Sequence, residues 1–100
     1  MSITTMSIID VIKNHIRESG YGYSSWYVGI ARDAKDALFS RHGVREKNDW
    51  YIARPAGSSR AARQIETYFV NVLGTAGGPG GGDYSTDMVY AYKMSNHTNP

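Results

Sequence analysis

The sequence contains no cysteine and no long apolar run. Without cysteine, the chain can form neither a disulfide nor a thiolate metal site, and we expect an intracellular, cytoplasmic protein. No apolar stretch approaches the roughly 20 residues of a membrane-spanning helix, so we expect no membrane partner. The first residues do not combine a basic segment with an apolar one, so no secretory signal is indicated.

A large excess of charge is also absent, because 11 Lys and Arg face 9 Asp and Glu, for a formal net charge of +2. This small positive charge favours polyanionic partners only weakly, and an ordinary basic surface explains it equally well. Arginine supplies most of it, and a guanidinium pairs well with phosphate. A chain of 100 residues has the size of one domain, which we place over residues 1–100.

The pattern of apolar and turn residues predicts a small α/β (α+β) domain with a three-stranded sheet flanked by three helices. Ser7 would cap the first helix. In the last strand, Tyr90 and Tyr92 would share one face of the sheet. The expected helices cover 7–19, 33–42 and 60–73, and the expected strands cover 26–31, 50–54 and 88–94. We also expect a glycine-rich connection over 74–85 and a frayed, disordered tail over 95–100.

Two features of the predicted strand–helix unit 26–42 point to chemistry. Gly29 inside a strand indicates close approach of another backbone or a ligand, and Tyr27 lies on the same face. Arg41 and His42 end the helix that follows. Both features also occur without any chemical role, because aromatic residues are common in strands and cations near a helix C-terminus are favoured by the helix dipole.

Two further candidates lie later in the chain. Glu66 stands beside apolar residues in a helix, where it could hold a hard divalent cation or simply be solvated. The stretch 77–83 is rich in glycine and includes Gly80 and Gly81, whose backbone N–H groups could hold phosphates or form a flexible crossover. This stretch matches neither a P-loop nor a dinucleotide-binding motif.

The order of these features is more specific than any one of them. A strand with Tyr27-x-Gly29, a charged helix ending in His42, a second strand and a helix bearing Glu66 together resemble the GIY-YIG nuclease family. The resemblance covers residues 26–73, about half of the chain.

The resemblance implies metal-assisted hydrolysis of phosphodiester bonds. It implies that Tyr27 assists the nucleophile and the phosphate, and that Glu66 holds one divalent cation, Mg²⁺ or Mn²⁺. An arginine on the first helix after the strand would stabilise the charged transition state, and a tyrosine of a first motif would help to activate water.

The sequence departs from the family pattern at the arginine position, ten residues after Tyr27, which holds Ala37. The chain is then an inactivated Arg-to-Ala form, which the otherwise intact pattern favours, or a naturally inactive homologue. The third possibility is that Arg32 or Arg41 substitutes, and Arg41, one turn after Ala37, is the better placed of the two.

The second departure is the missing first motif, because no Gly-Ile-Tyr-like strand precedes Tyr27 at the family's spacing. We therefore predict a permuted arrangement in which the last strand of the chain lies beside the Tyr27 strand. Tyr90 or Tyr92 would then replace the first tyrosine, with Tyr21 and Tyr23 as the alternatives.

Three functions follow as hypotheses. The first is a metal-dependent endonuclease acting on DNA more than on RNA, and the second is a non-catalytic nucleic-acid-binding module on the same scaffold. The third is a protein-interaction or inhibitory domain. In so short a chain, specificity would come from loops, from a homodimer or from a partner. The residues expected to contact nucleic acid are Arg32, Arg41, Arg63, Gly80 and Gly81.

Overall fold

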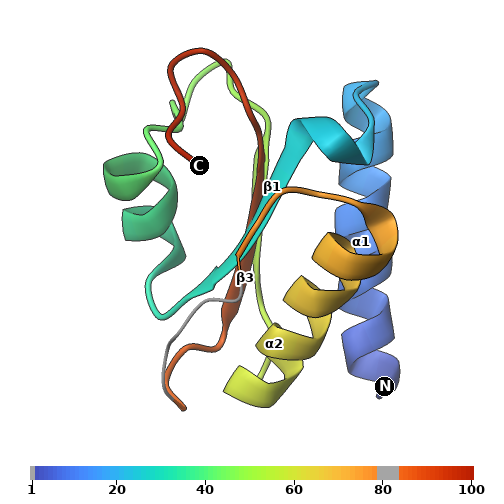
Figure 1. The fold of residues 1–100 in the computed structure, drawn as a ribbon. Coiled ribbons are helices and arrows are strands. Elements are labelled where there is room, and N and C mark those ends of the chain that lie inside the picture. Colours follow the sequence, from blue (N-terminus) through green and yellow to red (C-terminus); the bar gives the residue numbers. More distant parts are fainter. Residues whose placement is uncertain (1, 79–83) are drawn as a thin grey trace.

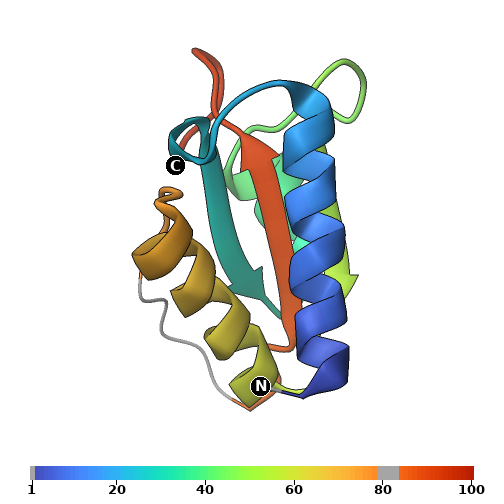
Figure 2. The same cartoon turned by 90° about the vertical axis from the view of Figure 1, so that its right-hand side faces the viewer.

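The computed structural model describes residues 2–78 and 84–100, which form three helical segments and a small antiparallel sheet (Figure 1). α1 and α2 cover one face of the sheet, as Figure 2 shows from their side, and η2 lies on the other face. In chain order the elements are α1 (Ile3–Ser19), the single turn η1 (Tyr23–Ser25), β1 (Trp26–Ala31), η2 (Asp36–Arg41), β2 (Tyr51–Pro55), α2 (Ser59–Thr67), its continuation η3 (Tyr68–Leu73) and β3 (Met88–Lys93).

The sheet has the strand order β1-β3-β2, and both pairs are antiparallel. The C-terminal strand β3 is therefore central and pairs directly with β1, with Tyr27 opposite Tyr92 and Gly29 opposite Tyr90. This confirms the prediction that the last strand lies beside the Tyr27 strand. The mixed fold with a small three-stranded sheet is confirmed as well.

Local capping sets the helix ends, and one predicted boundary is wrong. α1 begins at Ile3 because the side chain of Ser2, rather than that of Ser7, accepts a hydrogen bond from a first-turn N–H, that of Thr5, at 3.1 Å. Gly20 ends the helix in the left-handed region, with φ of 80°. The predicted cap before the last helix is present, since Ser58 Oγ accepts from the N–H of Ala61 at 3.1 Å.

The other two helical segments occupy the predicted ranges, with a wider turn in part of each. Asp33 caps the one that contains η2, because its carboxylate accepts from the N–H of Asp36 at 3.1 Å. η2 is a π-helix and ends with His42 N–H donating to the Ala37 carbonyl, five residues earlier, at 2.9 Å. Such wide turns are rare and often lie at functional sites.

Strand alternation gives the sheet two different faces. The face toward α1 and α2, here called the helix face, carries Trp26, Val28, Ile52, Val89 and Ala91, which pack against apolar residues of both helices. The opposite face, here called the tyrosine face, carries Tyr27, Gly29, Tyr90 and Tyr92 and is covered by η2.

Both edges of the sheet are protected against pairing with another chain. On the β1 edge, Ala76 accepts from the N–H of Val28 at 3.0 Å and donates to the Trp26 carbonyl at 2.8 Å. On the β2 edge, the guanidinium of Arg54 donates to the Ala53 carbonyl at 2.7 Å. β2 then ends at Pro55, which has no N–H to offer.

The C-terminal tail differs from the prediction. We expected residues 95–100 to be frayed, but Thr98 is only 8% exposed and the N–H of Asn99 donates to the His42 carbonyl at 2.7 Å. In Figure 1 the C-terminus accordingly lies on the η2 side of the sheet. Within residues 2–78 and 84–100, no helix combines the length and the apolar character needed to cross a bilayer.

Candidate functional site

Three tyrosines gather on the tyrosine face because they occupy alternate positions of paired strands. Tyr27 of β1 lies opposite Tyr92 of β3, with ring centroids 5.2 Å apart, and is stacked with Tyr90 at 6.3 Å. Tyr90 and Tyr92 are 4% and 0% exposed, whereas Tyr27 is partly exposed. Tyr27 is therefore the most exposed tyrosine of this cluster.

His42 joins the tyrosines from the end of η2. Its ring centroid lies 4.8 Å from that of Tyr27. Its Nε2 is 2.8 Å from the Tyr90 hydroxyl, and its Nδ1 is 2.6 Å from the backbone carbonyl of Asn99 and 3.0 Å from the Tyr92 hydroxyl. A histidine and two tyrosines thus form one hydrogen-bonded group on a single face.

The Asn99 carbonyl determines which ring nitrogen of a neutral His42 carries the hydrogen. A carbonyl oxygen can only accept, so Nδ1 carries the hydrogen and donates it at 2.6 Å. Nε2 then has a lone pair, and the Tyr90 hydroxyl donates to it. The geometry therefore points the Tyr90 proton at a basic nitrogen.

Gly29 is required because Tyr90 lies directly across it. A Cβ atom at this position would stand 2.5 Å from the Tyr90 hydroxyl oxygen and 3.1 Å from Cε1 of Tyr27. The close approach predicted at Gly29 is present, but the predicted partner, another backbone or a ligand, is wrong. The approaching group is an aromatic side chain rather than a backbone.

Burial holds all three tyrosines in their neutral form. Burial first, and the negative charge of Glu66 second, raise the pKa of Tyr27, while the charge of Arg41 lowers it. The pKa of Tyr90 is raised well above the ordinary value of a tyrosine, again chiefly by burial. Burial also raises the pKa of Tyr92, with a smaller contribution from Tyr27 and Tyr90. The three hydroxyls therefore keep their hydrogens and can donate hydrogen bonds at neutral pH.

Glu66 comes from the other side of the sheet, since α2 packs on the helix face. It is 6% exposed and lines a cavity of about 160 Å³ together with Thr67, Val70, Asn71 and Gly78. β1 is an edge strand, and the negative charge of Glu66 contributes, after burial, to the raised pKa of both Tyr27 and Tyr90. The carboxylate and the tyrosines thus stand on different layers of the fold, and none of the three tyrosines lines the cavity at Glu66.

Ala37 is completely buried and packs in the same cluster as Leu38, Tyr90 and Tyr92. A side chain at this position points to the tyrosine face. Arg41 is the cation whose charge acts on Tyr27 and Tyr90, in both cases lowering the pKa. Its exposed side chain also lies 3.7 Å from Asp36.

The remaining predicted residues do not gather at this cluster. Arg32 is exposed just after β1. Arg63 lies on the outer side of α2, where a shallow groove of about 470 Å³ runs along the helix. Gly80 and Gly81 lie outside the described residues. The groove is lined by Arg60, Arg63, Gln64, Thr67, Tyr68, Asn71 and Val72, and it shares Thr67 and Asn71 with the Glu66 cavity.

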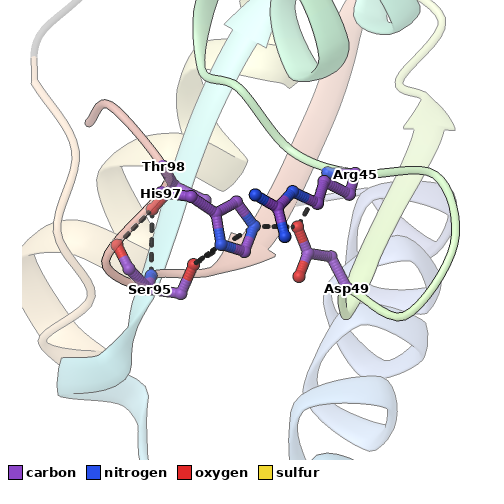
Figure 3. A network of polar contacts seen from close by, with 5 residues as sticks. All are labelled: Arg45, Asp49, Ser95, His97 and Thr98. Atoms are coloured by element: carbon purple, nitrogen blue, oxygen red, sulfur yellow. Dashed lines mark hydrogen bonds and ion pairs between the residues drawn. The ribbon is translucent and has the colours of Figure 1, made fainter.

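Sequence reasoning missed a polar cluster that holds the tail (Figure 3). His97 Nε2 lies 2.6 Å from the Asp49 carboxylate, which also accepts from the N–H of Arg45 at 2.7 Å. Ser95 Oγ is 3.1 and 3.4 Å from the two ring nitrogens of His97. Such similar distances place the oxygen over the ring face, so this trio lacks the in-plane geometry of a nucleophilic serine triad.

No cluster of three or more His, Cys, Asp or Glu side chains suited to a metal ion occurs among the described residues. A cation at Glu66 would therefore rely on one carboxylate, neighbouring amide or hydroxyl oxygens, water and substrate. Mg²⁺ accepts this arrangement, because it keeps several waters and binds through one or two carboxylates plus phosphate oxygens.

Comparisons with protein-family models, with curated proteins and with solved structures give no match to this chain.

Proposed function

We propose that this protein is a metal-dependent endonuclease that acts inside the cell and hydrolyses phosphodiester bonds, in DNA more than in RNA, on a permuted GIY-YIG-like scaffold. The observation that carries the proposal is the Tyr90–His42 hydrogen bond of 2.8 Å beside the partly exposed Tyr27. The charge of Glu66 acts on the same tyrosines. In this proposal, Tyr90 takes the part of the family's first-motif tyrosine.

The Tyr90–His42 pair supplies a route for the proton of the attacking water. The water transfers a proton to the Tyr90 oxygen while the Tyr90 proton moves to His42 Nε2, giving an imidazolium that the Asn99 carbonyl stabilises. The water oxygen bonds to phosphorus as the bond from phosphorus to the leaving oxygen breaks. The leaving oxygen takes a proton from solvent, and the His42 imidazolium returns its proton to solvent. Tyr27 orients the phosphate, because it is the most exposed tyrosine of the cluster.

The residues around Glu66 fit a hard divalent cation, Mg²⁺ or Mn²⁺. Glu66, which is 6% exposed, lines a cavity with Thr67 and Asn71, two residues whose side chains also carry an oxygen suited to such an ion. Such an ion, when bound, supplies Lewis-acid stabilisation of charge on the phosphate. The chain contributes the carboxylate that would hold it.

Nucleic acid would approach along the α2 groove next to this cavity. Arg60 and Arg63 lie at one end of the groove, and their guanidinium groups are suited to phosphate. Thr67 and Asn71 belong to both the groove and the Glu66 cavity. A strand tracked by the arginines is thereby led to the carboxylate.

Cleavage of supercoiled plasmid and of a structured RNA tests the proposal, in Mg²⁺ and in Mn²⁺. We expect Ala37→Arg to cleave about 10² to 10³ times faster than the unmodified chain, the usual contribution of a transition-state cation. Ala37→Met is the matched control, because it adds length at the same buried position without charge. Adding Glu66→Gln to Ala37→Arg should abolish the gain.

The proposal fails if Ala37→Arg and the unmodified chain are both inert while remaining folded. A Met variant as active as the Arg variant would also contradict it, since the gain would then not come from charge. The fold of each variant is checked by circular dichroism, because position 37 is fully buried and overpacking a core costs about 1–3 kcal/mol.

A second function, a non-catalytic nucleic-acid-binding module, is favoured by one observation. The site lacks a long cation at position 37, and the Ala37 side chain is sealed in the core. This function predicts salt-dependent binding without turnover, weakened by Arg60→Ala and unaffected by Glu66→Gln.

A further inference from the structure

The C-terminal tail contacts His42 twice through a single residue. The N–H of Asn99 donates to the His42 carbonyl at 2.7 Å, and the Asn99 carbonyl accepts from His42 Nδ1 at 2.6 Å. One residue of the tail therefore fixes both the backbone and the ring of His42. The contact spans 57 residues of sequence.

A separate polar cluster holds the tail in this position (Figure 3). His97 bonds the Asp49 carboxylate at 2.6 Å, and Asp49 is itself held by the N–H of Arg45 at 2.7 Å. The Thr98 hydroxyl accepts from the N–H of Ser95 at 2.9 Å and donates to its carbonyl at 3.0 Å, which closes a turn just before Asn99. The tail is thus anchored on the 45–49 loop and shaped by its own turn.

Gly43 allows the tail to lie close to the end of η2. Its φ is +70°, and a Cβ atom there would stand 3.0 Å from the His97 carbonyl oxygen and 3.5 Å from the Asn99 side-chain nitrogen. A larger residue at this position would have to displace the tail. The residue after His42 is therefore fitted to the segment that holds the ring.

We propose that the backbone carbonyl of Asn99 is a positioning group of the active site: it holds His42 in the tautomer with hydrogen on Nδ1, and the His97–Asp49 pair keeps it in place. Nε2 is thereby kept as the acceptor of the Tyr90 proton. The Tyr92 hydroxyl, at 3.0 Å from the same Nδ1, is a weaker competitor than the carbonyl at 2.6 Å. The catalytic role of this arrangement rests on the proposed endonuclease function. The assignment of the His42 tautomer does not depend on that function.

The tautomer is measured directly by nitrogen-15 NMR of the imidazole, with His42 assigned by substitution. The unmodified chain should show hydrogen on Nδ1 of His42. Deletion of residues 99–100 removes the carbonyl and should shift the ring toward the Nε2–H tautomer. Asn99→Ala is the matched control, because it removes the side chain but keeps the carbonyl, and it should leave the tautomer unchanged.

The anchoring pair is tested by His97→Ala, with His97→Gln as the conservative variant that can still donate to Asp49. His97→Ala should loosen the tail and weaken the Nδ1–H signature, and His97→Gln should restore it in part. In the Ala37→Arg background, deletion of 99–100 should lower kcat about 10- to 100-fold with KM nearly unchanged, the effect of a mispositioned base.

Two results overturn the inference. One is an unchanged His42 tautomer after deletion of 99–100, and the other is a kcat that the deletion leaves unaltered in a cleaving variant. If no variant cleaves nucleic acid but the tautomer shifts as expected, the endonuclease proposal fails and the positioning of His42 by the tail stands. If cleavage is found and the tautomer does not respond, the endonuclease proposal stands and the positioning of His42 by the tail fails.

Discussion

The two faces of the sheet are built from the same strands but carry different side chains, apolar ones on the helix face and tyrosines on the tyrosine face. In β1, Trp26 and Val28 enter a core of isoleucine, alanine and phenylalanine side chains supplied by α1 and α2 with η3. Tyr27, between them, joins Tyr90, Tyr92 and a histidine instead. Alternation along a strand therefore separates the part of the chain that stabilises the fold from the part that carries hydroxyls.

This difference indicates that the side chains of the tyrosine face are held in position by the packing of the helix face. The helix face is closed by two long helices, and its central residues are fully buried. The tyrosine face is covered only by η2, together with the tail that bonds His42. We expect substitutions on the first face to affect stability most, and substitutions on the second to affect the site at smaller cost to the fold.

The largest expected effect is on the helix face. Phe69 is 0% exposed, and Phe69→Ala should lower the free energy of unfolding by about 3–5 kcal/mol through lost burial and a cavity. Urea denaturation measures this change. Val72→Ala is the control, because Val72 lies on the same helix but is 65% exposed, and surface substitutions usually change stability by no more than about 0.5 kcal/mol. Equal effects at both positions would contradict the assignment of the core.

A smaller effect is expected where the tyrosine face touches β1. Gly29→Ala places a Cβ atom 2.5 Å from the Tyr90 hydroxyl, so we expect a loss of about 1–3 kcal/mol from overpacking. The displaced hydroxyl should also lose its hydrogen bond to His42, which proton NMR of the imidazole can follow. In Gly22→Ala the new Cβ meets nothing within 4 Å and φ is −76°, so that control should be neutral or stabilising. If Gly29→Ala left the free energy of unfolding unchanged, the close packing of Tyr90 against Gly29 would be contradicted.

The sequence predicted the strands and part of the tyrosine face, because the signals for both are local. Periodicity located all three strands, because apolar alternation and turn residues are local signals. It also placed Tyr90 and Tyr92 on one face. The pairing of the last strand with β1 was predicted from the resemblance to the nuclease family, because no first-motif strand precedes Tyr27 and a tyrosine-bearing strand ends the chain. Gly29 was identified because a glycine weakens a strand interior and is found there mainly where another group approaches closely.

The contacts that depend on distant residues were not predictable in this way. No local pattern indicates that His97 bonds Asp49, or that the Asn99 carbonyl bonds His42, because a backbone carbonyl carries no sequence signal and the partners are far apart in the chain. The tail therefore resembled a frayed end. Ser2 was missed as the cap because Ser7, with Asp10 three residues later, also matches a capping pattern and stands at the start of the apolar stripe.

The smallest expected effect distinguishes the two faces by pH. Burial raises the pKa of Tyr90 and Tyr92 above the ordinary value near 10, so above that pH the unfolded chain loses these protons while the folded chain keeps them. Stability is therefore fully present below about pH 10 and falls as the pH rises toward the folded-state values. Tyr90→Phe should cost about 1 kcal/mol at pH 7, the net worth of one hydrogen bond, and should make the alkaline fall shallower. Urea denaturation between pH 7 and about pH 11 measures both changes, with Tyr84→Phe, 90% exposed, as the control that keeps the parent slope. An alkaline fall of the same steepness in Tyr90→Phe would mean that the stability of the tyrosine face does not depend on this buried hydroxyl.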